Sequence, residues 1–484
     1  MSEVSKSDGW GAPRVGAKRG ALILAGGSAI DFVLKFLRSV LLARLLTVSD
    51  FGIVGTFMAA LSLLQMISNF NFGLLLVQHK RGNALDFAAA IKGLGIARAL
   101  VIAAALFLGA EPLARLMAQP DLAWAYRCLA IMPLLTIFQH NDATRFKRQM
   151  RFGPQMAVDI SASLVTLLMI WPLVIAFGDY RAALVMYAVQ GLMMVMVSHM
   201  VAEYPFRVSW DWEIAKLGIR FGWPLMLSGL VLFAILQGDR IIVANFYGNH
   251  ALGLISAVLV MVMTPLQFAG QLVRTYFLPI LSRHQSDPAV FDDRAAFTLQ
   301  STLCTALFSS LAYAVLGPFM LVVFFGEKFA EGGAYVALLG IAFSLQLLRA
   351  GSTTVAMARG RTINMLFANI LRVSFVGPAV AVALQGADIT SVIAVGVLGQ
   401  VCAIALSVGL LYLQRDLGRP RLMVAPYLCG LACLATLTVA IWQPDRGFAT
   451  FGPALVMSGF LCAATIASSR IMLRHLVAQI RGMV

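Results

Sequence analysis

The sequence predicts an all-α protein that crosses a membrane many times. Of its 484 residues, 60% are hydrophobic and only 12% are charged. The mean hydropathy is +0.85, whereas a soluble domain is only about 45–50% apolar. Apolar runs of about 20 residues, each long enough to span the hydrocarbon core as a helix, recur along the whole chain. These observations identify an integral membrane protein.

We predict fourteen transmembrane helices. The loops between them are short, which excludes a folded catalytic domain outside the membrane, so any function must be built from the helices and their ends. The predicted spans cover residues 20–46, 51–77, 87–110, 123–141, 155–178, 181–202, 219–247, 250–281, 295–325, 334–358, 362–386, 388–414, 423–442 and 452–472.

The basic residues of the loops predict the orientation, because Lys and Arg in short loops stay cytoplasmic. The even-numbered loops and the two chain ends hold 23 of the 37 Lys and Arg residues. The odd-numbered loops hold only Arg115, Arg181, Lys328 and Arg446. We therefore expect both termini in the cytoplasm. Basic loops against an anionic leaflet also explain the net charge of +15 without nucleic acid as a partner.

Other motifs point to no cofactor. The six cysteines fall in predicted spans, where a thiol packs as a small apolar group, and their spacing matches no zinc site. The six histidines form no cluster, so we expect no metal. A phosphate-binding loop with its lysine is also missing from the sequence, so we expect no ATP hydrolysis by this chain.

Ten basic residues and a few acids lie inside the predicted spans. An ionisable side chain in the bilayer core costs about 3 kcal/mol unless it faces protein or water, so these residues are functional candidates. Asp31, Lys35 and Arg38 share one face of the first helix, since four and then three residues separate them. Asp31 and Lys35 also fit a structural ion pair. Adjacent Asp239 and Arg240 cannot face the same side of a helix.

Three further basic residues lie near the ends of predicted spans. We expect Arg44, Lys92 and Arg127 to extend to the interface rather than to line a cavity.

A short internal repeat predicts two similar halves. Residues 45–54 and residues 246–255 each end a helix, cross a polar turn and restart with a Gly followed by two aliphatic residues. Gly52 and Gly253 are six predicted spans apart, an offset that preserves direction through the membrane. The repeat therefore predicts two parallel six-helix lobes, with the last two spans as an addition.

The segment from Phe36 to Gly52 resembles the first hairpin of bacterial oligosaccharide-lipid flippases, the polysaccharide transporter branch of the MATE-like exporter superfamily. The segment from Gln237 to Gly253, followed by Thr264-Pro265, is similar to the seventh and eighth spans of that family. The resemblance implies two lobes around a central cavity that opens alternately to the cytoplasm and the periplasm.

We accordingly expect five regions. They are a basic cytoplasmic tail at 1–19, an N-terminal lobe at 20–203, a cytoplasmic linker at 204–218, a C-terminal lobe at 219–414, and two additional helices with a tail at 415–484.

The resemblance also implies a cargo and a location. The cargo is an undecaprenyl-diphosphate-linked oligosaccharide, a lipopolysaccharide or exopolysaccharide repeat unit, which crosses the bacterial inner membrane toward the periplasm. The implied partners are this lipid-linked substrate, membrane lipids, a polysaccharide polymerase and a chain-length regulator. No catalytic residue is expected, because the activity is transport.

Such a cargo requires a wet, cationic groove. Arg suits a diphosphate because its planar guanidinium group donates paired hydrogen bonds and stays charged. Asp31 and Asp239 are candidates for binding a coupling ion. The candidates for binding substrate are Lys35, Arg38, Arg240, Arg274, Arg349 and Arg372.

Three alternatives remain open from the sequence. A MATE-like multidrug or cation antiporter would need carboxylates in its cavity, yet bases outnumber acids within the spans. A lipid II flippase shares the two additional helices. A membrane enzyme acting on the same lipid would usually carry a large periplasmic loop, and no odd-numbered loop here is large.

Overall fold

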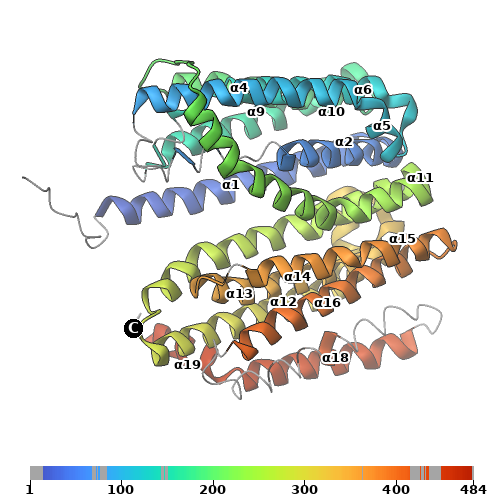
Figure 1. Ribbon diagram of the computed structural model, residues 1–484. Coiled ribbons are helices and arrows are strands. Elements are labelled where there is room, and N and C mark those ends of the chain that lie inside the picture. The colour runs from blue at the N-terminus through green and yellow to red at the C-terminus, as the bar shows by residue number, and fades with distance from the viewer. Residues whose placement is uncertain are drawn as a thin grey trace, which may run out of the picture. The chain divides into compact units, whose positions relative to one another are not determined.

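The computed structural model describes residues 15–67, 72, 75–76, 84–142, 146–147, 151–361, 363–414, 426, 430, 432–434 and 448–481. Within these ranges the chain forms helices and turns but no strand, which confirms the predicted all-α fold (Figure 1). In chain order the helices are α1 (Val15–Leu45), α2 (Val48–Ile67), α4 (Leu85–Leu108), α5 (Ala110–Leu116), η1 (Pro120–Leu122), α6 (Ala123–Leu129), α7 (Ile131–Ile137), α9 (Gly153–Phe177), α10 (Arg181–Met200), α11 (Trp212–Arg283), α12 (Pro288–Phe325), η2 (Glu327–Gly332), α13 (Gly333–Ala358), α14 (Ile363–Ser374), α15 (Val376–Leu384), α16 (Ile389–Leu413), α18 (Phe448–Ser468) and α19 (Arg470–Arg481).

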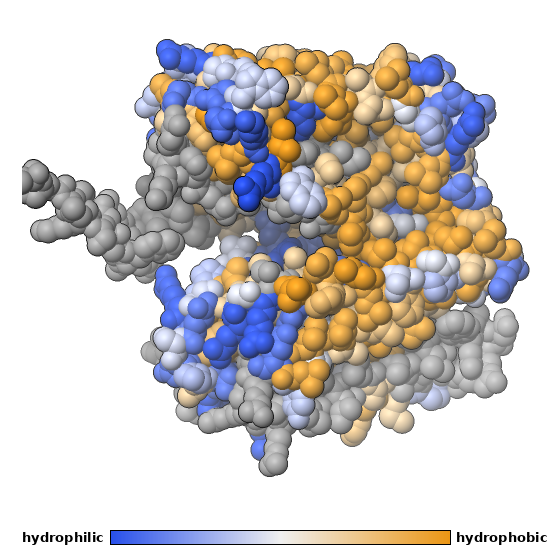
Figure 2. All heavy atoms as spheres, viewed as in Figure 1, coloured by the Kyte–Doolittle hydropathy of each residue, from blue (hydrophilic) through white to orange (hydrophobic). Residues whose placement is uncertain are grey.

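Many of these helices are membrane spans. In the described part of the chain, nine segments are long and apolar enough to cross a bilayer. Figure 2 shows hydrophobic residues over much of the visible surface, with hydrophilic residues gathered toward the helix ends. The chain is therefore a multi-pass membrane protein. The count of fourteen spans stays a prediction, and the span predicted at 423–442 lies almost entirely outside the described residues.

Two predicted spans are broken helices. The span predicted at 123–141 is divided at Ala130 into α6 and α7, each seven residues long. The span predicted at 362–386 is divided at Phe375 into α14 and α15. Pro378 explains the second break, because its ring lacks an N–H and would clash with a carbonyl one turn earlier.

Two other predicted spans form one continuous element. Helix α11 contains both the span at 219–247 and the span at 250–281, with a kink at Gly248. The backbone of Gly248 has φ 80° and ψ 179°, a region that is essentially restricted to glycine. The glycine thus bends the chain between the two arms of α11.

The chain divides into two compact units. The boundaries between them fall inside α1, α2, α5, η1 and α11. The predicted lobes at 20–203 and 219–414 follow chain order instead, and they stay a prediction. Unit 1 comprises Met1–Arg38, Leu64–Leu113 and Asp121–Gly229, and unit 2 comprises Ser39–Leu63, Ala114–Pro120 and Leu230–Val484.

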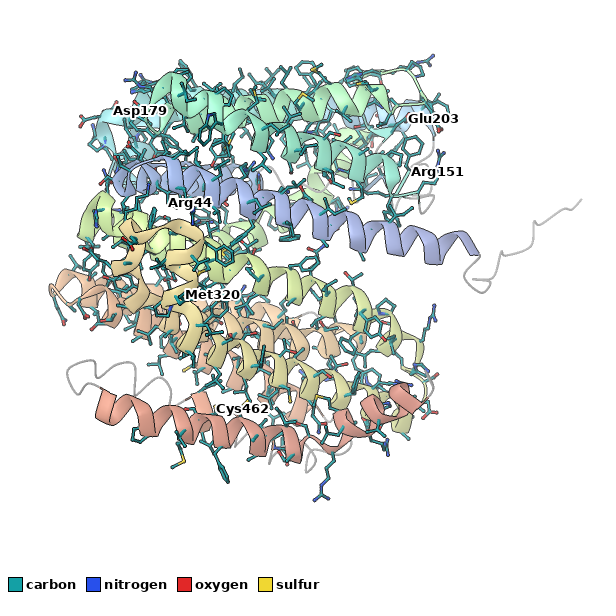
Figure 3. The ribbon with its side chains drawn as sticks, turned by 180° about the vertical axis from the view of Figure 1, so that it is seen from behind. Arg44, Arg151, Asp179, Glu203, Met320 and Cys462 are labelled. Carbon is teal, nitrogen blue, oxygen red and sulfur yellow. The ribbon has the colours of Figure 1, made fainter. Side chains whose placement is uncertain are left out.

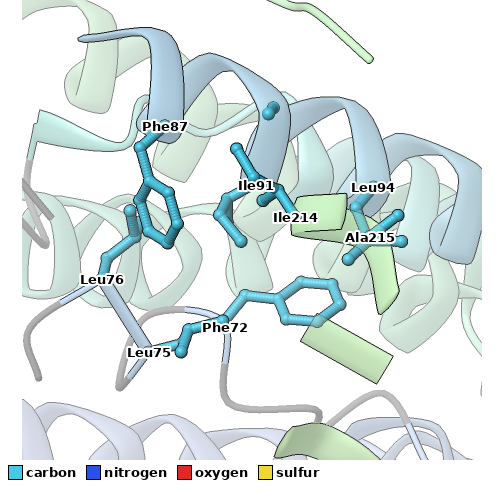
Figure 4. Close-up of a cluster of buried hydrophobic side chains, with 9 residues drawn as sticks. Phe72, Leu75, Leu76, Phe87, Ile91, Leu94, Ile214 and Ala215 are labelled. Atoms are coloured by element: carbon cyan, nitrogen blue, oxygen red, sulfur yellow. The ribbon is translucent and has the colours of Figure 1, made fainter. Parts of the chain in front are cut away.

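Unit 1 is built on the pair α9 and α10, with α7 packed against both α10 and α4. At one end of this unit, the Arg151 side chain donates to Glu203 over 3.0 Å, and Asp179 lies at the opposite end (Figure 3). A buried hydrophobic cluster joins the start of α11 to α4 (Figure 4). Its residues are Phe72, Leu75, Leu76, Phe87, Ala90, Ile91, Leu94, Ile214 and Ala215.

Hydrogen bonds hold the connection between α10 and α11 against the rest of unit 1. The Asp142 carboxylate accepts from the backbone N–H groups of Glu203, over 2.9 Å, and Tyr204, over 2.8 Å. The Ser209 N–H donates to a carbonyl of α4 over 3.1 Å. We name this connection, residues 201–211, the strap.

His140 orients the aspartate that holds the strap. The Asp142 N–H donates to His140 Nδ1 over 3.1 Å, and the His140 N–H donates to Ser198 Oγ over 2.9 Å. Because Nδ1 accepts a hydrogen bond, the ring carries its proton on Nε2 and is neutral. Burial lowers the pKa of His140, and the charges of His199 and Lys92 lower it further, whereas Asp142 opposes them.

Lys92 does not extend to the interface, so that prediction was wrong. It is buried in α4, and its Nζ donates to the carbonyls of Ile137, over 2.7 Å, and Gln139, over 2.5 Å. The last carbonyls of a helix have no partner within the helix. Lys92 therefore satisfies the end of α7.

Unit 2 packs α13 between α12 and α16, and α14 also packs on α16. Small residues allow the close approach of α12 and α13. A Cβ atom added at Gly340 would lie 2.6 Å from Tyr313 Cβ, and one added at Gly351 would collide with Thr302. Such small-residue contacts are typical of membrane helices.

The two repeated hairpins pack against each other inside unit 2. A Cβ atom added at Gly52 of α2 would collide with the backbone carbonyl of Asn249. One added at Gly253 of α11 would collide with the carbonyl of Val48. Each hairpin thus presents its glycine to the backbone of the other, which explains why both carry a Gly at the same place. We name this the hairpin contact.

Two basic side chains reinforce the hairpin contact. Arg44 donates from Nε to the carbonyl of Phe324 over 2.7 Å and from Nη2 to the carbonyl of Val323. Lys328 donates in return to the carbonyl of Arg44 over 2.9 Å and to that of Leu46. The ends of α1 and α12 are therefore satisfied reciprocally.

The hairpin contact predicts a cost for any added side chain. We expect Gly52→Ala and Gly253→Ala each to lower the free energy of unfolding by about 1–3 kcal/mol, because the backbone must move away from the new methyl group. Thermal unfolding of the detergent-solubilised protein measures this. The matched control is Gly26→Ala, where nothing lies within 4 Å of the added atom. An unchanged unfolding midpoint for both test variants would contradict the close packing.

The neutral state of His140 predicts that the attachment of the strap to the rest of unit 1 depends on pH. Since its pKa in the folded protein is below the ordinary value of about 6.5, the unfolded form binds more protons as the pH falls. The contribution of His140 to the free energy of unfolding is therefore fully present above about pH 6.5 and declines as the pH falls below this value. We expect hydrogen-exchange protection of Glu203 and Tyr204, corrected for intrinsic rates, to fall between pH 8 and pH 5.

A substitution isolates the histidine. His140→Asn should remove this pH step, and His250→Asn, at an exposed histidine, should retain it. Equal pH dependence in the wild type and in His140→Asn would assign the effect to another group.

Candidate functional site

Three arginines and one aspartate of unit 2 form a polar cluster within apolar helices. Asp239 and Arg274 lie on α11, Arg349 on α13 and Arg372 on α14. Arg349 and Arg372 are buried, with 6% and 4% exposure, and Arg274 is exposed. Arg349 interacts electrostatically with both other arginines. We name these four residues the arginine cluster.

The only carboxylate of the arginine cluster is loosely paired. Asp239 Oδ2 lies 4.0 Å from Arg372 Nη2, which is longer than a charge-assisted hydrogen bond of about 2.7–2.9 Å. Gly396 of α16 lies beside this pair. A Cβ atom added there would lie 3.4 Å from Arg372 Nη2 and 3.9 Å from Asp239 Oδ1.

The arginines retain unused donor groups. Arg349 donates from Nη1 to Asn369 Oδ1 over 2.5 Å. The Nε atoms of Arg349 and Arg372 are buried and have no hydrogen-bond partner among the residues that the structure describes. Burying a polar group without a partner is costly. These N–H groups are therefore available to a ligand.

A glutamine on α16 adds an unused acceptor. Gln400 is 3% exposed, and its Oε1 has no partner in the described ranges. It follows Gly396 by four residues, so both lie on the same face of the helix. That face is turned toward Arg372 and Asp239.

The arginine cluster has the chemistry of an anion site. It places three guanidinium groups against one carboxylate, so positive charge is in excess. Guanidinium groups bind phosphate oxygens through paired hydrogen bonds. A metal would need acidic, His or Cys ligands, and no group of three or more such residues occurs in the described part of the chain. The site thus suits a phosphate or diphosphate ligand.

Arg240 does not belong to the arginine cluster. Its Nη1 donates to Gln237 Oε1 over 2.7 Å, and the amide of Gln237 donates to Ser62 Oγ of α2 over 3.2 Å. Arg240 therefore faces α2, while its neighbour Asp239 faces α14. The predicted separation of these two side chains is confirmed.

Asp31, Lys35 and Arg38 belong to unit 1. Lys35 Nζ donates to Asp31 over 2.7 Å, and Ser163 Oγ donates to the same carboxylate over 2.6 Å. Asp31 thus forms the ion pair that its spacing from Lys35 permits. Arg38, with 9% exposure, donates from Nη1 to Gln190 Oε1 over 2.8 Å. Whether these three residues line a cavity stays a prediction.

The predicted site residues do not include the neutral residues that lie beside these charges. They are Asn369, Gln400, Ser163 and Gln190, and each lies beside or toward a charged residue of an apolar helix. Their signal in the sequence is an amide or hydroxyl residue inside a predicted span.

Comparison with known families matches residues 41–332 to the family described as polysaccharide biosynthesis protein. This match covers more than half of the chain and includes both repeated hairpins.

The chain is similar to the succinoglycan biosynthesis transport protein ExoT of Rhizobium meliloti (strain 1021). It is 25% identical over 335 residues, which are 68% of this chain. The chain spans 66% of the length of that relative.

Solved structures share the fold at low identity. An inward-facing multidrug resistance MATE family transporter of the MOP superfamily has a TM-score of 0.64 and 13% identity, over 84% of this chain and 95% of that chain. The lipid II flippase MurJ, in an inward closed conformation, has a TM-score of 0.66 and 12% identity, over 94% of this chain and 100% of that chain. The family predicted from the two hairpins is thus confirmed: the chain belongs to the polysaccharide biosynthesis protein family and has the fold of MOP superfamily transporters.

Proposed function

We propose that the protein is a flippase, a transporter and not an enzyme, for an oligosaccharide linked to undecaprenyl diphosphate. It moves this repeat unit from the cytoplasmic to the periplasmic face of the bacterial inner membrane by alternating access. The observation that carries the proposal is the arginine cluster, with its excess of buried cations and its unused N–H groups.

The arginine cluster matches the diphosphate of this cargo. A diphosphate carries about two negative charges, and the three arginines exceed Asp239 by two positive charges. Binding would give the Nε groups of Arg349 and Arg372 the acceptors that they lack among the described residues. Asp239 lies far enough from Arg372 to be displaced by phosphate oxygens without loss of a strong bond.

The family membership and the relative favour a polysaccharide cargo. The printed name of the relative describes transport in succinoglycan biosynthesis. A drug or cation antiporter of the same fold would need acidic groups, whereas arginines dominate here. The similarity to MurJ supports the fold and leaves lipid II as the alternative cargo, which is also a diphosphate-linked lipid.

Unit 1 holds a second set of candidate residues. Arg38 is a further candidate for the diphosphate, held in place by Gln190. Asp31 and Asp239 are the candidates for a coupling proton or cation. Asp31 accepts hydrogen bonds from Lys35 and Ser163, so its carboxylate is held between α1 and α9.

The hairpin contact is the proposed gate. Alternating access requires a barrier that closes on one side of the membrane and opens later. Gly52 and Gly253 give this barrier close backbone packing, and Arg44 and Lys328 bind the helix ends on either side of it. Gln119 also donates to Asn249. The gate opens when these contacts separate.

The arginine cluster predicts loss of export on truncation. We expect Arg349→Ala and Arg372→Ala each to reduce surface polysaccharide by roughly tenfold or more, because a hydrogen bond to a charged group contributes about 1.5–3 kcal/mol. Arg349→Lys should retain part of the activity, since the charge remains while the paired geometry is lost. Complementation of a deletion strain measures export, with protein levels checked by immunoblot.

A surface arginine provides the control. Arg151→Ala removes an exposed side chain whose partner, Glu203, is also exposed, and should leave export unchanged. Normal export by both Arg349→Ala and Arg372→Ala, at normal protein levels, would remove the arginine cluster from the substrate path.

The proposed gate predicts that a disulfide across it blocks export reversibly. In a cysteine-free background, the pair Gln119→Cys and Asn249→Cys should form a disulfide across the gate and stop export, and a reductant should restore it. The control pair, Ser352→Cys and Ser407→Cys, joins hydroxyl groups 2.8 Å apart on α13 and α16 and should not block transport. Undiminished export by the oxidised gate pair would show that this contact does not open.

A further inference from the structure

Unit 1 contains an open cavity of about 550 Å³. It lies among α4, α6, α7, the end of α9 and α10, and its wall is almost entirely apolar. The volume is within the range of about 300–1,000 Å³ that is usual for small-molecule sites. The wall includes Phe107, Leu129, Ile131, Met132, Phe177 and Leu184.

The break in the predicted fourth span shapes this cavity. Helices α6 and α7 meet at Ala130, and both line the wall. Phe107, Ile131 and Phe177 are 54%, 47% and 43% exposed, so the cavity is open along an apolar side. In a membrane-spanning chain such a side faces lipid chains.

Two arginines line the same cavity. The guanidinium of Arg181 lies 5.9 Å from the ring centroid of Trp124 and 3.4 Å from the carboxylate of Asp179, measured from Nε. Arg127 is exposed and has no hydrogen bond or ion pair with any residue that the structure describes. Trp is enriched at the membrane interface, where the headgroups lie. The charged part of the cavity thus fits the depth of a lipid headgroup.

This arrangement is unexpected on topological grounds. Arg181 is one of only four basic residues in the odd-numbered loops, where the orientation rule disfavours positive charge. An arginine that only extends to the interface needs no concave apolar wall beside it. Here the cations and the apolar cavity are continuous.

We propose that this cavity binds an anionic phospholipid of the bilayer. Its phosphate contacts the guanidinium groups of Arg127 and Arg181, and an acyl chain lies along the wall formed by Phe107, Ile131 and Phe177. The ligand must have both an acyl chain and a negative charge, because the apolar wall accepts any acyl chain and the arginines select negative charge. The site is separate from the arginine cluster, which belongs to unit 2.

Lipid retention tests the proposal. The purified protein is reconstituted in nanodiscs of equal phosphatidylglycerol and phosphatidylethanolamine, and the lipids retained after mild detergent release are measured by native mass spectrometry. We expect phosphatidylglycerol to be enriched, and the variant Arg127→Gln with Arg181→Gln to lose that enrichment by roughly tenfold. Ala188→Phe, at another wall position, should reduce retention of both lipids.

Cys128 gives a second measurement within the cavity. Its thiol is exposed and lines the same wall. Its alkylation rate, measured on the Cys128 peptide, should be several-fold slower in phosphatidylglycerol liposomes than in liposomes of neutral lipid. In the double arginine variant the two rates should be equal.

The controls separate the possible occupants. Arg151→Gln, at the opposite end of unit 1, should retain phosphatidylglycerol like the wild type. Equal retention of both lipids by the wild type, or full phosphatidylglycerol retention by the double variant, would overturn the proposal. Displacement of phosphatidylglycerol by an equimolar amount of undecaprenyl phosphate would also overturn it and assign the cavity to the carrier lipid.

Discussion

A polar group inside a bilayer has no water to bind, so its partner must come from the protein, and this constraint organises both units. Lys92 supplies donors to the end of α7 in unit 1. Arg44 and Lys328 do the same for two helix ends in unit 2. In each case a basic side chain, from an apolar span for Lys92 and Arg44 and from η2 for Lys328, completes a helix terminus.

The same constraint distinguishes the arginine cluster from other charges of the chain. Asp31, for example, accepts hydrogen bonds from both Lys35 and Ser163. The arginine cluster differs, because its buried Nε groups have no partner in the described part of the chain. An incompletely satisfied group of like charges is costly unless a ligand completes it. For the proposed flippase this is the required compromise, since a fully satisfied site would not bind its cargo and an empty cationic site would be unstable.

Composition and span length predict the helical fold well, because burial of about 20 apolar residues leaves few alternatives. The repeat also locates Gly52 and Gly253 correctly as special positions, although only the structure shows that they face each other. The breaks at Ala130 and Phe375 each lie three residues before a proline, Pro133 and Pro378, so the sequence carries a signal for them that hydropathy alone does not. The partners of Lys92, Arg349 and Arg240 could not be predicted, since hydropathy says nothing about which face of a helix meets which neighbour. Asn369 and Gln190 can be recognised as amides inside predicted spans, but the charge that each contacts depends on the packing of the helices.

The capping of distant helix ends also sets an order for biosynthesis. Lys92 reaches a carbonyl acceptor 45 residues further along the chain, so α4 emerges from the ribosome before its partner exists. Arg44 binds a carbonyl 280 residues later. The end of α1 therefore gains these contacts only after α12 has been synthesised. A chain truncated before α7 would leave the buried Lys92 without its carbonyl acceptors, which gives membrane quality control a direct means to detect incomplete copies.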